Sequence, residues 1–344
     1  IAAVCLAGFT FAQDAPLWMR HSVISPDGTT IAFTYKGDIY TVPVAGGRAM
    51  QITTNPAYDT APVWSPDSKR IAFASDRMGS LDVYIVAKDG GEPRRLTTHS
   101  GSETPLAFTD AGHVLFSAGI MPSAEAVVFP SNGQFNQVYR VSVEGGRPTM
   151  ISSMPMECIS INKEGAMLYQ DKKGYEDYWR KHHVSPIARD IWMYTPGKEP
   201  QYRQLTTFGG EDREPVWAPD GKTFYYLSEE NGSFNIYRRT PGDAKAVQLT
   251  HYTKNPVRYL SAATDGRLCY GFDGEIYTLL PGGEAQKVNI SIVSDRNDKD
   301  IIRQIKSSGA TEMAVSPDGK EVAFVLRGDV YVTSVEYKTT KQIT

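Results

Sequence analysis

The 344-residue sequence predicts an all-β fold in which four-stranded antiparallel sheets pack as blades around a common axis, a β-propeller. Three observations predict it. A tight turn of the type SPDG recurs seven times, at intervals of roughly 40 to 56 residues, the range of propeller blades. Each turn is followed by two short runs rich in β-branched and aromatic residues, which suit strands. Each unit then closes on a phrase such as QIT, RLT or QLT.

The seven turns share a common residue pattern. They start at residues 25, 65, 109, 162, 218, 263 and 316 and read SPDG, SPDS, TDAG, NKEG, APDG, ATDG and SPDG. Proline at the second position presets φ, and glycine at the fourth suits the exit of the turn. The turn carboxylates are expected to accept hydrogen bonds from nearby backbone N–H groups, a structural role; they are Asp27, Asp67, Asp220, Asp265 and Asp318.

In each unit one strand precedes the turn, two strands follow it, and a fourth strand closes the unit. The strands before the turns read RHSVI, APVWS, TPLAF, ECISI, EPVWA, VRYLS and EMAVS. The third strand of each unit ends in an aromatic residue, which we expect to pack within the blade: Tyr40, Tyr84, Tyr139, Trp192, Tyr237, Tyr277 and Tyr331. A single four-stranded sheet cannot bury both of its faces, so repeated sheets must pack on one another.

The spacing of the units predicts the domains. We expect a six-bladed propeller over residues 14–292, because the gap after the sixth unit exceeds twenty residues and is charged and unpatterned. That stretch, 293–311, is interpreted as a linker, and 312–344 as the first blade of a second propeller. The alternative is one seven-bladed ring.

The first residues differ from the repeats. The apolar run IAAVCLAGFTF is followed by small and polar residues, which is typical of the end of a secretory signal peptide, and residues 1–13 are interpreted as its remnant. The run is too short to span a bilayer, so no membrane span is expected. The alternative is a buried N-terminal strand. Export would place the protein in the periplasm or at the surface of a bacterium.

Several classes of function lack support. The net charge of −3 provides no basic surface for nucleic acid. The sequence has no G-x-S-x-G, P-loop or dinucleotide fingerprint, so we expect no catalytic residue and no cofactor here. No metal site is expected, because the adjacent His182 and His183 would point to opposite sides of an extended chain. Cys158 and Cys269 are expected to be free thiols.

Two insertions interrupt the repeats, at 119–135 and 171–189. Loops on a rigid scaffold often carry function. The second contains YEDYWRKHH, an aromatic and basic cluster that could hold a peptide carboxylate. The candidate peptide-binding residues are Tyr178, Trp179, Arg180, Lys181, His182, His183 and Arg189. The alternative is a loop packed over a blade, with Trp179 as its anchor.

The phrases SPDGTTIAFTYKGDIYTVP, APVWSPDSKRIAFASDR, GYEDYWRKHH…RDIW and SPDGKEVAFVLRGDVYVT resemble the N-terminal propeller region of tricorn-type serine peptidases, in particular the exported bacterial branch. The SPDG repeat alone is shared with TolB-like and prolyl-oligopeptidase propellers. The YEDYWRKHH insertion and the layout of six units plus one are more specific.

The resemblance implies a large, ATP-independent, homo-oligomeric peptidase whose propellers filter and channel peptides to a catalytic portion outside these residues. It implies an arginine pair for the substrate C-terminus, but the comparable loop, residues 99–104, has Ser102 and Glu103 there. Two alternatives stay open: a stand-alone TolB-like periplasmic binding propeller, and the propeller of a prolyl-oligopeptidase-type enzyme.

Overall fold

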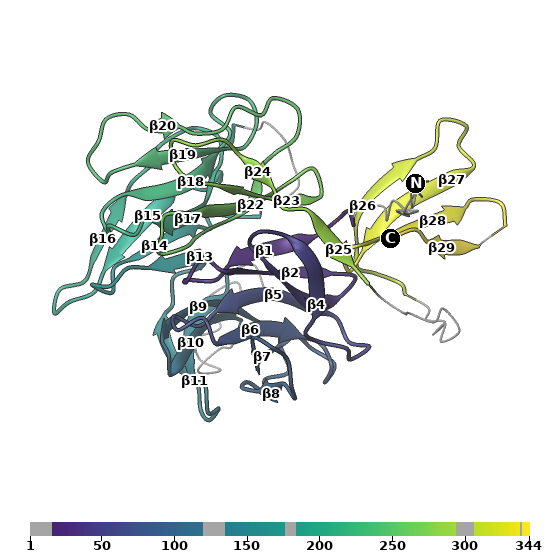
Figure 1. Cartoon of the computed structure of the whole chain (residues 1–344), viewed down its shortest axis with the longest axis horizontal. Coiled ribbons are helices and arrows are strands. Elements are labelled where there is room, and N and C mark those ends of the chain that lie inside the picture. Colours follow the sequence, from purple (N-terminus) through teal and green to yellow (C-terminus); the bar gives the residue numbers. More distant parts are fainter. Residues whose placement is uncertain (1–15, 120–134, 176–183, 294–305, 338) are drawn as a thin grey trace, which may run out of the picture.

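The computed structural model describes residues 16–119, 135–175, 184–293, 306–337 and 339–344. Every regular element in these ranges is a strand, which confirms the predicted all-β propeller fold (Figure 1). Residues 1–13, interpreted above as a signal-peptide remnant, and most of the first insertion lie outside the described residues.

Six sheets follow one another along the chain. The first contains β1 (Arg20–Ile24), β2 (Thr30–Tyr35), β3 (Asp38–Pro43) and β4 (Gly47–Gln51). The second contains β5 (Asp59–Trp64), β6 (Arg70–Ser75), β7 (Asp82–Ala87) and β8 (Arg94–Arg95). The third contains β9 (Glu103–Asp110), β10 (His113–Ala118), β11 (Gln137–Ser142) and β12 (Thr149–Ser152).

The remaining three follow the same order of strands. The fourth contains β13 (Met156–Ile161), β14 (Met167–Asp171), β15 (Ile191–Thr195) and β16 (Gln201–Gln204). The fifth contains β17 (Asp212–Trp217), β18 (Phe224–Ser228), β19 (Asn235–Arg239) and β20 (Val247–Gln248). The sixth contains β21 (Arg258–Ala262), β22 (Leu268–Phe272), β23 (Glu275–Leu279) and β24 (Gln286–Lys287).

These six sheets, hereafter the ring, pack in succession. The first strand of each sheet contacts the first strand of the next, and β21 of the sixth sheet contacts β1 of the first. Each of the six hydrophobic clusters found in the described residues joins two neighbouring sheets. Burial of apolar surface between sheets therefore holds the ring together.

A late strand completes the first sheet. β25 (Ile290–Ile292) pairs in parallel with β4, with Ile290 opposite Gly47. The Gly47 N–H donates to the Asn289 carbonyl at 2.8 Å. Gly46 has a φ of +85°, and a Cβ there would lie 2.6 Å from the same carbonyl oxygen. Glycine at this position thus permits the close approach of the two segments.

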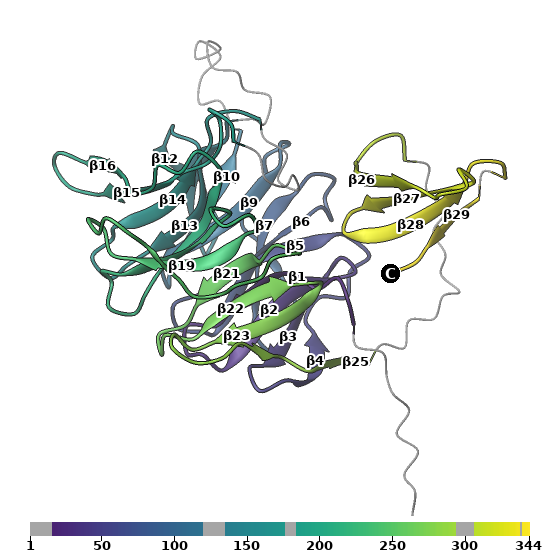
Figure 2. The ribbon, with the colours of Figure 1, turned by 90° about the horizontal axis from the view of Figure 1, so that it is seen from above.

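A seventh sheet projects to one side of the ring in both views (Figure 1, Figure 2). It contains β26 (Ala310–Val315), β27 (Glu321–Leu326), β28 (Asp329–Ser334) and β29 (Thr340–Gln342). The apolar side chains of β26 are exposed, with Met313 at 74% and Val315 at 60%, and those of β27 and β28 are half-buried apart from the buried Val325. Its two faces therefore lack the packing that each sheet of the ring has.

The aspartate of the turns and the aromatic residue of the third strands have local structural roles. In the turns, the Asp67 carboxylate accepts hydrogen bonds from the Ser65 hydroxyl and the Lys69 N–H, at 2.5 and 3.2 Å. These hydrogen bonds, with the Ser65 bond foremost, lower the pKa of Asp67. Tyr84 stacks on Phe73 with ring centroids 5.9 Å apart. Equivalent aromatic pairs occur in most sheets, which supports the predicted packing role of these aromatics.

The threonine that ends each QIT-type phrase anchors the third strand. Its hydroxyl accepts a hydrogen bond from a backbone N–H in the first two residues of that strand. The donor–acceptor pairs, at 2.8–2.9 Å, are Ile39–Thr53, Val83–Thr97, Ile191–Thr206, Ile236–Thr250 and Val330–Thr344. In these five sheets the threonine after the fourth strand thus supplies an acceptor to a third-strand N–H group.

Candidate functional site

Both insertions and the seventh sheet lie at one face of the ring. Because the strands alternate in direction, the connection from the second to the third strand lies at the edge where the first strand begins. Both insertions are connections of this kind, so both leave the same face, here called the connection face. The seventh sheet also meets the ring there, through Arg327, which forms an ion pair with Asp76 and lies 5.9 Å from the Tyr58 ring.

A pocket of about 580 Å³, the mouth pocket, opens on the connection face. Its lining combines aromatic, cationic and acidic side chains, among them Trp18, Arg20, Arg258, Tyr259, Phe272 and, from the seventh sheet, Glu312. The Met19 N–H donates to the Gly274 carbonyl at 3.2 Å, which ties the segment before β1 to the sixth sheet. The pocket is thus assembled from three sheets.

The polar groups of the mouth pocket are held in place by one another. The Arg20 guanidinium lies 5.9 Å from the centre of the Trp18 ring. The His21 ring lies 4.9 Å from that of Tyr259. Burial, with the nearby Arg20 charge, lowers the pKa of His21 to about 4. His21 is therefore neutral at physiological pH, and the arginines supply the positive charge of this region.

Arg189, the one candidate peptide-binding residue within the described residues, belongs to a buried ionic network. Its side chain is 6% exposed. Nε donates to Glu157 at 3.0 Å, and Nη1 donates to the fully buried Glu211 at 3.2 Å. Glu211 also pairs with Arg213. In this structure the Arg189 guanidinium is engaged by the protein itself, where it links the end of the second insertion to the fourth and fifth sheets.

The other candidate residues lie outside the described residues: Tyr178, Trp179, Arg180, Lys181, His182 and His183. Tyr175, just before them, is 74% exposed. In the loop compared with the arginine pair, Ser102 is exposed, whereas Glu103 is fully buried at the start of β9. Glu103 therefore belongs to a contact between sheets and offers no surface for peptide. Cys158 and Cys269 are free, as predicted.

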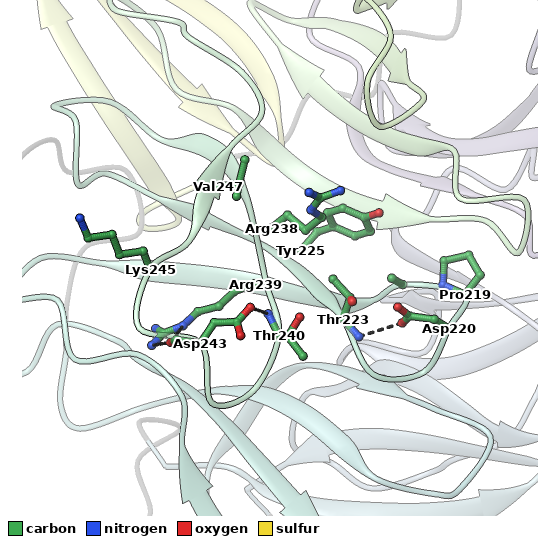
Figure 3. A pocket seen from close by; sticks show the side chains of 11 residues that line it. Pro219, Asp220, Thr223, Tyr225, Arg238, Arg239, Thr240, Asp243, Lys245 and Val247 are labelled. Carbon is green, nitrogen blue, oxygen red and sulfur yellow. Dashed lines mark hydrogen bonds between the residues drawn. The ribbon is translucent and has the colours of Figure 1, made fainter.

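A second pocket, of about 480 Å³, lies on the fifth sheet (Figure 3). Arg238 and Lys245 contribute cations, and Tyr225 contributes a buried ring. Arg239 donates to the carbonyls of Asp243 and Leu205, so it braces the loop. The lining includes the turn at 218–223, so this pocket lies at the opposite edge from the connection face.

Both pockets combine aromatic rings with charged side chains. Among the described residues, no cluster of His, Cys, Asp or Glu has a geometry that would hold a metal ion. The same residues include no helix with the length and apolar character needed to cross a membrane. Sequence reasoning missed the mouth pocket because its residues lie far apart in the chain; Trp18 and Arg20 before the first turn were the available signal.

Comparisons with known proteins identify relatives of the chain. A family profile described as the tricorn protease N-terminal beta propeller domain matches residues 16–285. Tricorn protease homolog 1 of Streptomyces coelicolor is 26% identical over 289 residues, which cover 83% of this chain and 26% of that protein. The tricorn protease of Thermoplasma acidophilum is 25% identical over 333 residues, covering 93% and 29%.

Solved structures agree on the fold. The crystal structure of the tricorn protease superposes with a TM-score of 0.68 at 20% identity, covering 95% of this chain and 31% of that one. A puromycin hydrolase structure follows with a TM-score of 0.51 at 13% identity, covering 96% and 54%. The chain spans 26–29% of the length of the curated relatives it matches.

Proposed function

Since the chain belongs to the family of tricorn protease N-terminal β-propeller domains, we propose that it admits peptides to, or channels them from, a serine-type catalytic portion of a longer tricorn-like peptidase. The observation that carries the proposal is the family match over most of the ring, on a closed succession of sheets whose connection face bears the mouth pocket. A rigid ring passes an unfolded peptide and excludes a folded domain.

We propose the finer points on the same basis. The six sheets form one propeller, supported by the contact of β21 with β1 and by the pairing of β25 with β4. The seventh sheet begins a second propeller, supported by its exposed apolar faces. The parent enzyme is exported and homo-oligomeric, and residues 178–183 of the second insertion contact peptide.

Two measurements test the proposal. The 344-residue chain should fold and bind unfolded peptides while it cleaves none, and the longer protein should cleave them. Peptide hydrolysis by the chain itself, abolished by one substitution within residues 14–344, would contradict the placement of the chemistry elsewhere.

In the longer protein, R180A/K181A should raise KM for peptides with little change in kcat. An unchanged KM with a lowered melting temperature would instead favour a packing role.

A further inference from the structure

Two contacts between neighbouring sheets of the ring bury pairs of carboxyl groups. Between the second and third sheets, Asp82 at the start of β7 faces Glu103 at the start of β9, and both are fully buried. Between the fourth and fifth sheets, Asp190 beside β15 faces Asp212 at the start of β17, at 6% and 2% exposure. A buried charge is costly unless it is paired and hydrogen-bonded.

A closing threonine lies beside each pair of carboxyl groups. Its single hydroxyl proton is not enough to donate a hydrogen bond to both carboxylates. Thr206 Oγ1 accepts from the Ile191 N–H at 2.9 Å and lies 3.4 Å from Asp190. It also lies within hydrogen-bonding reach of Asp212. A hydroxyl has one proton, so it cannot donate to two carboxylates at once. Thr97 accepts from the Val83 N–H at 2.9 Å in the same way and lies within hydrogen-bonding reach of Glu103.

Several buried carboxylate oxygens of these two pairs lack a hydrogen-bond donor. Both carboxylate oxygens of Glu103, Oδ1 of Asp82 and Oδ1 of Asp212 are buried without a hydrogen-bond partner, while Oδ2 of Asp82 faces Arg95. A proton on one member of each pair would supply the missing donor. Buried polar groups without partners are rare in folded proteins and call for such an explanation.

The neighbouring cations decide which member takes the proton. Arg95 pairs with Asp82 at 2.9 Å, and Lys173 with Asp190 at 2.5 Å. Glu103 and Asp212 have no cation of their own among the contacts of the described residues. The other ionisable groups that act on Asp212 are Glu230 and the phenols of Tyr226 and Tyr237. The Glu230 and Asp190 carboxylates disfavour a second negative charge, whereas both phenols keep their protons in this pH range.

We propose that Glu103 and Asp212 are two proton-dependent joints of the ring, each holding a proton when neighbouring sheets are closed and losing it as the contact loosens. The joints flank the third and fourth sheets, the two that carry the insertions. Deprotonation therefore loosens one segment, β9–β16, and with it the insertion-bearing part of the connection face. This inference does not depend on the activity of the parent enzyme.

The direction of the pH effect follows from burial. Burial foremost raises the pKa of Glu103 from 4.5 to about 7 and that of Asp212 from 3.8 to about 7. Below these raised values the folded chain keeps protons that the unfolded chain has lost, so stability is highest at acid pH and falls as pH rises toward 7. Each joint lowers the folded-to-unfolded ratio by about tenfold per pH unit between pH 5 and 7.

Other contacts in the ring provide internal controls. Asp59, at the contact of the first and second sheets, is paired with Arg77 at 2.9 Å and so has its own cation. At the contact of the fifth and sixth sheets, the neutral Asn235 takes the place of the acid, and it accepts from the Thr250 hydroxyl at 3.0 Å. Burial still raises the pKa of Asp59, but the Arg77 charge opposes this effect, so the first of these contacts should hold a proton less firmly than the two joints. The second has no acid at the position of Asn235.

The experiment compares urea unfolding of the 344-residue chain at pH 5.5, 6.5 and 7.5 and constant ionic strength. The wild-type midpoint should fall with pH. E103Q and D212N, whose amides mimic the protonated acids, should each remove part of this fall, and the double variant should remove most of it. D59N should remove less of this fall than E103Q or D212N. Equal slopes for wild type and double variant would overturn the proposal.

A second measurement covers the case in which a variant does not fold. Infrared spectroscopy of the wild-type chain should show a protonated carboxylic acid band that persists at pH 6 and is lost by pH 8.5. Absence of this band at pH 6 would overturn the proposal without any variant. Hydrogen exchange, corrected for intrinsic rates, should show that protection in β9–β16 falls more than in the first and sixth sheets as pH rises. A uniform change would refute the loosening of one segment.

Discussion

The contribution of a closing threonine to stability can be measured by substitution. Thr250 is 6% exposed, and its hydroxyl accepts from the Ile236 N–H at 2.9 Å and donates to Asn235 at 3.0 Å. Replacing Thr250 by valine keeps the volume and removes both bonds. The Asn235 oxygen retains the Tyr252 N–H at 2.8 Å, so the uncompensated loss is the buried N–H of Ile236.

Leaving one buried N–H without a partner costs about 1–3 kcal/mol, and we expect about 2 kcal/mol for T250V. For a domain of this size that corresponds to a fall in melting temperature of about 3–4 °C. Differential scanning calorimetry of the 344-residue chain measures it. T250S is the matched control, because it keeps the hydroxyl and loses one methyl group worth about 0.8 kcal/mol. A loss for T250V no larger than that for T250S would refute the anchoring role.

Three further predictions follow from the same structure. G46A should destabilise the ring by at least about 2 kcal/mol in urea unfolding, since its Cβ would meet a backbone carbonyl at 2.6 Å. G47A, with nothing within 4 Å, should cost only the backbone strain. R189M should cost about 1.5–3 kcal/mol, because it removes the charged hydrogen bonds to Glu157 and Glu211, which keep Lys172 and Arg213 as their remaining cations; a loss under 1 kcal/mol would contradict that network. Burial raises the pKa of Cys269 to about 12 and that of Cys158 well above its usual range, so in a C5S chain a thiol reagent at pH 8 should react with neither until the chain unfolds.

The repeat made the strands and turns predictable, because each unit has its own turn, aromatic residue and closing phrase. Asp67 and Tyr84 were assigned structural roles from their repetition alone, and their contacts agree. The period of the pattern reports local geometry, which neighbouring residues determine.

Contacts between units could not be predicted in this way. β25 is only three residues long and stands outside the repeat, so its pairing with β4 gave no signal. Glu103 was compared with a surface position, yet it is buried against Asp82. Which charges meet across two sheets depends on how the sheets are packed, and the spacing of residues within one unit carries no information about it.

The strand that completes the first sheet also has a consequence for biosynthesis. β1–β4 leave the ribosome first, but their outer edge gains β25 only after residue 292 has emerged. Until then the earliest sheet presents an open edge strand, which is a template for pairing with other chains. A nascent chain shorter than this is therefore the stage most in need of a holding chaperone, and slow translation of the sixth sheet would prolong it.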